Sequence, residues 1–416
     1  MALHFYMNIQ EKPALFPFMN DAVKLFRKEY IMKKLNFAVI GCGALAQGTH
    51  IPCLAQSEKA NLHTCCDLSD DILTLCQTKF GSQHICKDWK AAIENPEVDA
   101  ICLCTTEKLR FPVISYAAQF HKPVYVEKPL ATSMEEIYKI QKAVHESGIP
   151  FCVGHNRRNS PAMRDAHDIF RKHMEDNQQE PWRWKREPGR PNRKDDGRAS
   201  MSVRVNDDWY SWKGWVFDPV QAPYGPMLFE MTHFTDLCNW FMDSEPEEVV
   251  AMETGMLNHA IIIKYKTGEL ATLNMCANGT FGYPKELYEI MGNGAIVVVD
   301  HMCEVRTAGI PGAPAVKKYD FIKDRHQDVG IQGGIEGFRE KKAAALKEAA
   351  EANDPMLQFT AEPDKGHWAA LENFIDQING FRGEVCGVDD AVCASQVAFA
   401  AIKSAREKRF VRVDEI

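Results

Sequence analysis

The sequence predicts an α/β protein in which a parallel sheet with helices on both faces precedes an α+β region with an open, mainly antiparallel sheet. Three observations predict this. A short apolar strand, Leu35–Ile40, runs into the glycine-rich turn Gly41-Cys42-Gly43-Ala44-Leu45-Ala46. Short strands and helices then alternate to about residue 155, which is typical of a parallel sheet. After about residue 245 the strands alternate apolar and polar residues, as antiparallel strands with one solvated face do.

Composition and charge narrow the class of protein. The chain has 416 residues, of which 45% are hydrophobic and 25% charged, and its formal net charge is -8. We expect no nucleic-acid partner, because nucleic-acid-binding surfaces are basic. We expect no membrane span, because no apolar run approaches about 18–20 residues. The 14 cysteines are scattered, which is typical of reduced thiols in a cytoplasmic protein. No metal site is expected.

The first half of the chain supplies the expected parallel sheet. Its strands are expected at Leu35–Ile40, Asn61–Cys66, Ser82–Cys86, Val98–Cys104, Pro123–Val126 and Phe151–Gly154. Its first helix is expected to end at His50–Ser57, and further helices or helical turns are expected at Asp70–Phe80, Trp89–Ile93, Phe111–Phe120 and Met134–His145.

The second half begins with a helix over 156–180, an irregular Trp-rich insert over 181–225 and a helix over 226–241. Strands are then expected at Glu248–Thr254, Ala260–Tyr265, Leu270–Ala277, Tyr288–Met291, Ala295–Asp300 and Cys303–Arg306. The chain is expected to close with helices at 334–352, Trp368–Asn379 and Val388–Lys408 and a strand at Phe410–Val413.

These elements predict four parts. Residues 1–31 form an extension, interpreted as an arm or as the result of an upstream start codon, since Met32-Lys33-Lys34 directly precedes the first strand. Residues 32–155 form the dinucleotide-binding domain. Residues 156–387 form the substrate and oligomerisation domain with its insert at 181–225, and residues 388–416 form a closing helix and strand.

The turn after the first strand is typical of a dinucleotide-binding site. Gly41 is expected to form the tight turn, Gly43 to leave room for phosphates, and Ala46 to let the helix pack closely on the strand. Ala44 and Leu45 open a helix whose N-terminus favours a pyrophosphate. The alternation of strands and helices that follows supplies the context that this motif needs.

Asp67 ends the second expected strand, 24 residues after Gly43. An acidic residue about 20 residues beyond such a turn binds the ribose hydroxyls of NAD. No Arg directly follows Asp67 to hold a 2′-phosphate, which favours NAD over NADP. The alternative, that Asp67 caps the helix at 69–80, fits the same position.

Four motifs occur in an order and spacing that resemble one known family. They are Gly41–Ala46, Glu127-Lys128-Pro129, Glu230-Met231-Thr232-His233-Phe234-Thr235-Asp236 and Glu289-Ile290-Met291-Gly292-Asn293-Gly294. Together they resemble the glucose–fructose oxidoreductase / inositol dehydrogenase / MocA (Gfo/Idh/MocA) family over about residues 33–300 and 388–413. The resemblance implies an N-terminal Rossmann domain, a C-terminal sheet that often serves as an oligomer interface, and an active site between the two domains.

The resemblance also implies roles for single residues. Glu127 and Lys128 lie by the nicotinamide, and Lys128 binds both the cofactor and the substrate hydroxyl, where a cation lowers the proton affinity of a forming alkoxide. His233 is the general acid/base. The alternatives are that Lys128 is a surface lysine and His233 a core histidine. The other implied contacts are Thr105 and Thr106 with the cofactor, and Asn156 and Arg157 with the substrate.

The chain departs from the family pattern near His233. Many members have an Asp four residues before this His, where it orients the ring, and this chain has Phe229 there. Glu230 shares a helix face with His233 and is therefore counted as catalytic; alternatively, the helix register differs and the orienting acid comes from elsewhere. Asp236 matches a family acid and is structural or catalytic. Glu107 is a second departure, in a segment where members commonly have Thr-Pro-Asn.

The Trp-rich insert is the most individual part of the sequence. Trp209, Trp212 and Tyr224 are expected to contact the substrate, because aromatic faces stack on the C–H faces of pyranose rings. A basic run over 183–198 offers a partner for an anionic group. The alternative, given equal weight, is that the Trp residues fill an oligomer contact and the charges are solvated.

These observations favour an NAD(P)-dependent dehydrogenase that moves a hydride between nicotinamide and a carbinol carbon of a sugar, polyol or glycoside. Two alternatives stay open. The first is an NAD-dependent enzyme that cleaves a glycoside through transient ring oxidation and elimination, and the second is a non-catalytic NAD-binding sensor. We expect a homo-oligomer, a dimer or tetramer, formed through the C-terminal sheet.

Overall fold

The computed structural model describes residues 34–176, 198–209, 218, 220, 222–255, 257–323, 327–328, 333–354, 357–358 and 362–416. Several predictions fall outside the described residues. They are the extension at 1–31, the basic run apart from Arg198, and all of the insert's Trp residues except Trp209.

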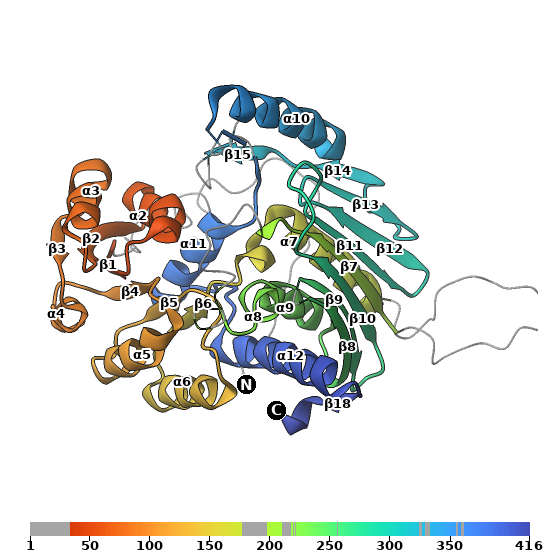
Figure 1. Cartoon of the computed structure of the whole chain (residues 1–416), viewed down its shortest axis with the longest axis horizontal. Helices are drawn as coiled ribbons and strands as arrows, with labels where there is room; N and C mark the ends of the chain where they lie inside the picture. The colour runs from red at the N-terminus through yellow and green to blue at the C-terminus, as the bar shows by residue number, and fades with distance from the viewer. Residues whose placement is uncertain are drawn as a thin grey trace, which may run out of the picture.

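The first domain is the predicted parallel sheet with helices on both faces (Figure 1). Its six strands lie in the order β3-β2-β1-β4-β5-β6. Their bounds are β1 (Leu35–Ile40), β2 (Ala60–Cys66), β3 (His84–Cys86), β4 (Ala100–Leu103), β5 (Val124–Val126) and β6 (Phe151–Val153). All five strand pairs are parallel. The order reverses between β1 and β4, which is where ligands bind in open sheets of this kind.

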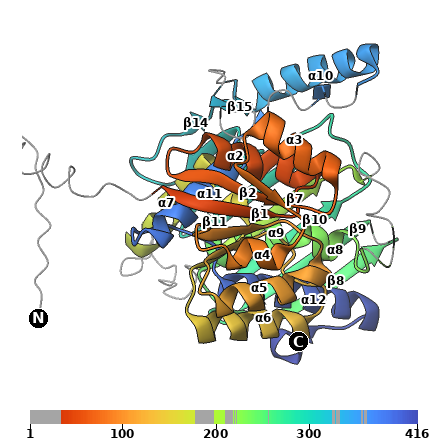
Figure 2. The same ribbon diagram turned by 90° about the vertical axis from the view of Figure 1, so that its left-hand side faces the viewer.

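Two helical layers cover this sheet (Figure 2). A π-helical segment, η1 (Ala46–His50), leads into α2 (Ile51–Gln56), which packs on one face together with α3 (Asp70–Phe80). The other face is covered by α4 (Trp89–Glu94), α5 (Arg110–Gln119) and α6 (Met134–Ser147). Because both faces are buried, the strands are apolar almost throughout, and such apolar runs can be recognised in the sequence.

The helix ends in this domain follow local sequence rules. The Ser69 hydroxyl accepts a hydrogen bond from the Ile72 amide at 3.4 Å, and Ser133 caps α6 in the same way. Gly81 and Gly148 end these two helices with φ of 74° and 64°, a conformation in which a glycine has no steric penalty. Asp67 therefore does not cap the helix; Ser69 does.

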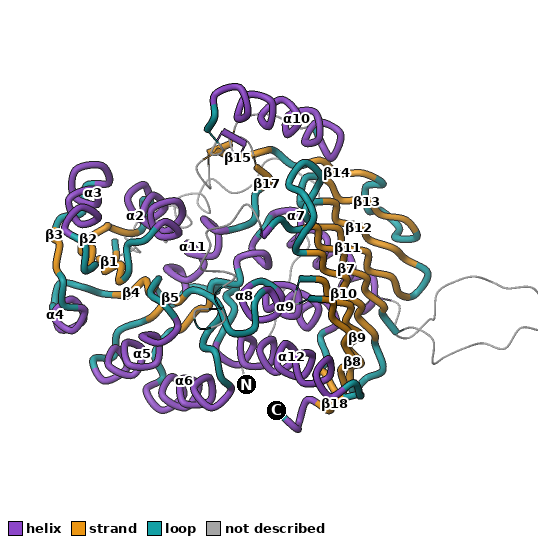
Figure 3. Tube along the Cα trace, in the orientation of Figure 1, coloured by secondary structure: helices purple, strands orange, loops and turns teal. Residues whose placement is uncertain are grey.

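The second domain is built on a mainly antiparallel sheet, as predicted (Figure 3). Within the described residues it has nine strands in the order β14-β13-β12-β11-β7-β10-β9-β8-β18. Their bounds are β7 (Ser200–Asn206), β8 (Pro246–Thr254), β9 (Asn258–Tyr265), β10 (Leu270–Cys276), β11 (Glu286–Gly292), β12 (Ala295–Asp300), β13 (Glu304–Ala308), β14 (Val316–Lys318) and β18 (Val411–Arg412). One face packs on α7 (Pro161–Asp176), α9 (Met231–Met242) and α12 (Val388–Glu407).

The structure corrects three predictions in this domain. The insert at 181–225 is not irregular throughout, because β7 lies in the middle of the sheet between β10 and β11. The helix expected over 226–241 is interrupted: α8 (Pro226–Phe229) and α9 are separated by Glu230, whose φ of -123° and ψ of -39° are not helical. The helix expected from 156 starts at Pro161, after the 3-10 turn Asn156–Asn159.

Small elements complete the fold. A three-stranded sheet consists of β15 (Phe321–Lys323), β16 (Gln327–Asp328) and β17 (Glu362–Pro363), and α10 (Gly334–Ala352) lies beside it. Among the described residues, no helix combines the length and the apolar character that crossing a bilayer requires.

Two C-terminal helices join the domains. The helix α11 (His367–Ile378) packs on the parallel sheet, where Phe374 lies against Phe37 and Tyr125. The first turns of α12 belong to the core of the parallel-sheet domain, and its later turns belong to the core of the second domain. The end of the chain therefore contributes to both cores.

Candidate active site

The glycine-rich turn is held by close backbone packing. Gly41 has a φ of 85°, and a Cβ on it would lie 2.9 Å from the Cys104 carbonyl carbon and the Thr105 amide nitrogen. Only glycine fits such a position without strain. A Cβ on Gly43 would meet no atom within 4 Å, so the space beside Gly43 is open. Ala44 and Leu45 are exposed and begin the helix.

Asp67 lies at the carboxyl end of β2 and is oriented by two backbone amides. Its Oδ2 accepts a hydrogen bond from the Cys42 amide at 2.9 Å, and its Oδ1 accepts one from the Ser69 amide at 3.0 Å. The first contact ties Asp67 directly to the glycine-rich turn. The turn and the acidic residue that sequence reasoning paired therefore lie side by side in the fold.

The two threonines after β4 differ in burial. The Thr105 hydroxyl is buried and has no hydrogen-bond partner among the described residues, which leaves it available to a ligand beside Gly41. Thr106 is exposed. Arg110 donates to the Thr105 carbonyl and is paired with Glu107 at 3.3 Å. The Glu107 carboxylate is therefore engaged by Arg110.

Glu127 and Lys128 follow β5, at the same edge of the sheet as the glycine-rich turn. Glu127 is buried; its Oε1 lies 2.7 Å from His50 Nε2, and its Oε2 accepts from the Lys128 amide at 3.1 Å. Burial opposes ionisation of Glu127, but the hydrogen bond and charge of His50 lower its pKa below the usual value. The Lys128–Pro129 peptide bond is cis.

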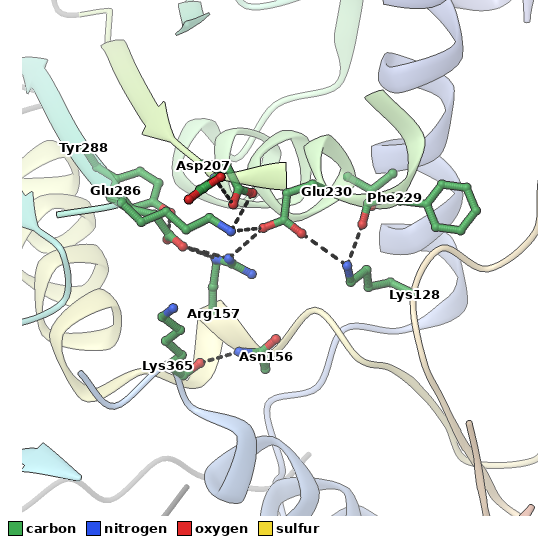
Figure 4. Close-up of polar contacts among 12 residues, drawn as sticks. Lys128, Asn156, Arg157, Asp207, Phe229, Glu230, Glu286, Tyr288 and Lys365 are labelled. Carbon is green, nitrogen blue, oxygen red and sulfur yellow. Dashed lines mark hydrogen bonds and ion pairs between the residues drawn. The ribbon is translucent and has the colours of Figure 1, made fainter. Parts of the chain in front are cut away.

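The Lys128 ammonium reaches across to the second domain (Figure 4). Its Nζ donates to the Phe229 carbonyl at 2.5 Å and lies 3.4 Å from Glu230 Oε2. This contact lies where the helix is interrupted at Glu230, and the His233 amide donates to the Glu230 carbonyl at 3.2 Å. Lys128 is thus not a surface lysine but part of a contact between the two domains.

Glu230 is the centre of a cluster of basic groups. Besides Lys128, its carboxylate contacts Lys285 Nζ at 2.5 Å and Arg157 Nη2 at 3.3 Å. Burial would raise the pKa of Glu230, but the charges of Lys285 and Lys128 lower it well below the usual range. The expectation that Glu230 orients the His233 ring finds no support in this geometry, because the carboxylate is directed at cations.

His233 lies on α9 and is 5% exposed. Its Nδ1 has no hydrogen-bond partner among the described residues. The nearest ring is that of His155, which meets it edge to face at 5.5 Å. Burial, and then the positive charges of Arg157 and Lys128, lower the pKa of His233 well below its usual value. The imidazole is therefore neutral at physiological pH.

Asp236 belongs to a separate buried contact. Its carboxylate accepts two hydrogen bonds from Arg158, at 2.7 and 2.8 Å, and a third from the Cys386 thiol. This bidentate contact ties the 3-10 turn Asn156–Asn159 to α9, which is a structural role.

Arg157 extends the network away from Lys128. Its guanidinium donates to Glu286 through Nε at 3.0 Å and through Nη2 at 2.7 Å, and Tyr288 donates to the same carboxylate at 2.5 Å. Lys285 also pairs with Asp207 at 2.8 Å. The sequence analysis did not single out Lys285 or Glu286. The sequence does carry a sign of Glu286. It lies four residues before apolar Ile290 on β11, so both side chains are on the buried face of the strand, where a carboxylate is unusual.

The remaining residues that were predicted to contact the substrate lie in different surroundings. The Asn156 amide donates to the Lys365 carbonyl at 2.6 Å, so Asn156 anchors backbone. Trp209 is 2% exposed and belongs to the core of the second domain. The Tyr224 ring packs on Phe399 and beneath Arg406 of α12, and its contact with the substrate stays a prediction. Trp212 lies outside the described residues.

The residues at the end of the parallel sheet fit an NAD molecule. The open side of Gly43, the buried unpaired Thr105 hydroxyl and the oriented Asp67 carboxylate meet the needs of a pyrophosphate and a ribose. The contacts of Asp67 among the described residues are with backbone amides, and none is with an arginine that could hold the 2′-phosphate of NADP.

Comparisons with known proteins agree with this geometry. Residues 35–155 match the model of an oxidoreductase family with an NAD-binding Rossmann fold, GFO_IDH_MocA. The myo-inositol 2-dehydrogenase of Thermotoga maritima is 20% identical over 408 residues, which are 92% of this chain and 99% of that protein. The NAD(+)-dependent scyllo-inositol 2-dehydrogenase of Bacillus subtilis is 34% identical over 88 residues, 21% of this chain and 26% of that protein.

Solved structures share the whole fold. A levoglucosan dehydrogenase in complex with NADH and levoglucosan superposes with a TM-score of 0.69 at 18% identity, covering 92% of this chain and 100% of that one. A probable dehydrogenase from Thermotoga maritima gives a TM-score of 0.65 at 19% identity over the same shares. The cofactor domain therefore matches the NAD-binding domain of the Gfo/Idh/MocA oxidoreductase family, and the chain is similar to dehydrogenases along nearly their full length.

Proposed function

We propose that this dehydrogenase oxidises or reduces a carbinol carbon of a sugar, polyol or glycoside, with Lys128 and His233 acting on the substrate oxygen. One observation carries the proposal. Two distant segments, the end of β5 and the start of α9, meet at Lys128 and Phe229, and they bring a buried imidazole, that of His233, within reach of the charge of the Lys128 ammonium. An alcohol that loses a hydride needs both a cation beside its oxygen and an acceptor for its proton.

Lys128 is the group we assign to the substrate oxygen. An ammonium has three donors; two are directed at the Phe229 carbonyl and at Glu230, and the third is the one that polarises the substrate. Glu230 balances this charge. Because Glu230 also contacts Arg157 and Lys285, it is held at a fixed distance from Lys128 and acts as a positioning residue.

His233 is the group we assign to the proton. A general base must be unprotonated to work, and burial together with neighbouring positive charges keeps this imidazole neutral. NAD, when bound, accepts or supplies the hydride, and Gly41, Gly43, Asp67 and Thr105 are the residues that would hold it. Glu127 contributes indirectly. Its carboxylate accepts a hydrogen bond from the Lys128 amide, which fixes the backbone from which the Lys128 side chain extends.

The test is NADH formation, followed by absorbance, with a panel of polyols, hexoses and glycosides and NAD+. We expect substrate-dependent NADH, and we expect Lys128→Met and His233→Ala each to lower kcat by about 10²–10³-fold. Lys139→Met, which removes an exposed lysine of α6, is the matched control. Full turnover by His233→Ala would contradict the assignment.

The same experiment separates the alternative functions. Release of an aglycone without net NADH would support cleavage through transient oxidation. NAD binding without turnover of any panel member would support a sensor.

We also propose that the outer face of the second sheet joins copies of the chain. Four large apolar side chains point outward from β8, β9, β10 and β11 of this sheet, and each is at least 40% exposed: Met252, Ile262, Leu270 and Met291. Such apolar faces mark interaction sites. The molar mass from light scattering tests this, and a monomer at micromolar concentration would contradict it.

A further inference from the structure

A short turn before α11 is anchored against the segment that carries Arg157. Gly366 has a φ of 81°, and a Cβ on it would lie 2.3 Å from the Asn159 carbonyl carbon and the Ser160 amide nitrogen. The Gly366 amide donates to Asp364 Oδ1 at 2.7 Å, and Asn156 holds the Lys365 carbonyl. The backbone of Lys365 is therefore fixed from both sides, next to the ion network.

The Lys365 side chain extends from this turn toward Glu286 and Arg157 (Figure 4). No carboxylate of the described residues lies within ion-pair distance of its ammonium. Glu286 is already engaged by Arg157 and Tyr288, and Glu362 is paired with Lys342 at 3.2 Å. Burial lowers the pKa of Lys365 below its usual value, although Glu286 partly opposes this. The lysine is thus half-buried and has no ion-pair partner among the described residues.

The charges of the network do not balance among the described residues. Four basic groups, Lys128, Arg157, Lys285 and Lys365, face three carboxylates, Asp207, Glu230 and Glu286. The contacts run in order from Lys128 through Glu230 and Arg157 to Glu286. Lys365 stands at the end of this series opposite Lys128, so the surplus positive charge lies away from the proposed site of hydride transfer.

A second polar group beside Lys365 also lacks a partner. His301 is 3% exposed, and its Nδ1 has no hydrogen-bond partner among the described residues. His301 and Met302 have φ values of 49° and 57°, because they are the central residues of the tight turn between β12 and β13 that the hydrogen bond from the Cys303 amide to the Asp300 carbonyl closes. The His301 amide donates to the Glu286 carbonyl at 2.8 Å, so His301 lies next to the residue that the Lys365 side chain approaches. Burial, and then the charge of Lys365, lower the pKa of His301 well below its usual value.

We propose that Lys365 and His301 form a subsite for one carboxylate, so that the substrate is a sugar acid whose reacting carbinol lies at Lys128 and His233. This inference rests on the proposed function and specifies its substrate class. A carboxylate carries a single negative charge, which matches a surplus of one, and its two oxygens can accept from an ammonium and from an imidazole N–H. A phosphate, with its second charge, would be left uncompensated.

The experiment compares each hexose with its own uronic acid: glucose with glucuronate, galactose with galacturonate, and mannose with mannuronate. Binding is measured by calorimetry on protein saturated with NADH, and turnover is measured with NAD+. We expect at least one uronate to bind about tenfold or more tightly than its parent hexose, because a hydrogen bond to a charged group exceeds one to a neutral group by about that margin. Lys365→Met should bring this ratio close to one.

Two controls keep the result interpretable. Lys347→Met removes an exposed lysine from α10 and should leave the ratio as in the wild type. The melting temperature of Lys365→Met should equal or exceed that of the wild type, because an unpaired, partly buried cation is removed. A lower melting temperature with the ratio retained would show a purely structural lysine and overturn the inference.

The outcomes also separate the inference from the proposed function. Turnover of hexoses or polyols with no preference for any uronate overturns the carboxylate subsite and leaves the dehydrogenase assignment standing. Absence of both binding and turnover for every acid and every neutral sugar overturns both.

Discussion

The glycine-rich turn and the ion network around Arg157 are both polar sites in buried surroundings, and they are built in opposite ways. The turn at 41–46 uses backbone conformation within one segment, tied by one hydrogen bond to Asp67. The network uses charged side chains from the 3-10 turn Asn156–Asn159, the end of β7, the break between α8 and α9 and the start of β11, with the turn before α11 at its edge. The first site depends on the absence of side chains, and the second depends on their pairing.

This difference predicts different responses to mutation. A change in the turn acts through steric overlap and through lost ligand contacts, because little charge is buried there. A change in the network leaves a desolvated partner uncompensated, which is among the largest effects that a single substitution produces. Glu286 and Gly41 are the residues at which the contrast is sharpest.

The largest effect is expected for Glu286→Gln. It removes the closer of the two carboxylates that Arg157 contacts and leaves this buried guanidinium with Glu230 alone, at 3.3 Å. We expect a loss of about 3–5 kcal/mol in the free energy of unfolding. Urea denaturation measures this. Glu135→Gln, which breaks an exposed pair with Lys139 on α6, should cost less than about 0.5 kcal/mol. Equal effects for the two variants would contradict the contrast between the sites.

The same pair predicts a pH dependence. Burial opposes ionisation, but the charge and hydrogen bonds of Arg157 lower the pKa of Glu286 to about 2. A carboxyl with a depressed pKa stabilises the fold above its unfolded pKa of about 4.3 and loses that contribution as the pH falls toward about 2. The difference in unfolding free energy between the wild type and Glu286→Gln should therefore be largest near neutrality and shrink below about pH 4.

A smaller effect is expected in the turn. Gly41→Ala places a Cβ 2.9 Å from the β4 backbone at a positive φ, and we expect it to cost about 1–2 kcal/mol of stability and to weaken NAD binding. Gly43→Ala meets no protein atom within 4 Å, so it should keep the melting temperature and weaken NAD binding alone. Gly48→Ala, also in open space, is the control for both. Calorimetry with NAD+ and thermal unfolding distinguish the three outcomes.

The smallest effect is expected at Asp67. Asn can still accept from the Cys42 amide but has no charge, so Asp67→Asn should preserve the turn and weaken NAD binding by about tenfold. NADP binding should weaken less or improve, because a carboxylate repels the 2′-phosphate. An unchanged NAD-to-NADP affinity ratio would contradict the assignment of Asp67 to the ribose.

The strands of the parallel sheet and several helix ends could be predicted, because short stretches of the sequence determine them. The strands of the parallel sheet are apolar because both faces are covered, and Ser69, Ser133, Gly81 and Gly148 end or begin helices for reasons that act within a few residues. The position of Lys128 after β5 follows from the same sheet geometry.

Other features depended on distant partners. The strand β7 has seven residues that alternate between buried and outward positions, with Ser, Arg and Asn outward. It follows a charge-rich run in a segment that the sequence analysis interprets as irregular, and its pairing with β10 and β11 places it in the sheet. Glu230 was placed on a continuous helix, but the helix is interrupted there, and its carboxylate is bound by three cations from three segments. Lys285, Glu286 and Lys365 could not be grouped from sequence, because nothing local records that they meet.

The position of α11 has a consequence for how the protein is made. Phe374 packs against Phe37 and Tyr125, so the core of the N-terminal sheet stays open until residues near 374 have left the ribosome. About nine-tenths of the chain must be synthesised before the cofactor domain can close. A nascent chain paused near residue 155 would present these aromatic rings to chaperones, and a fragment of residues 32–155 would lack the helix that covers them.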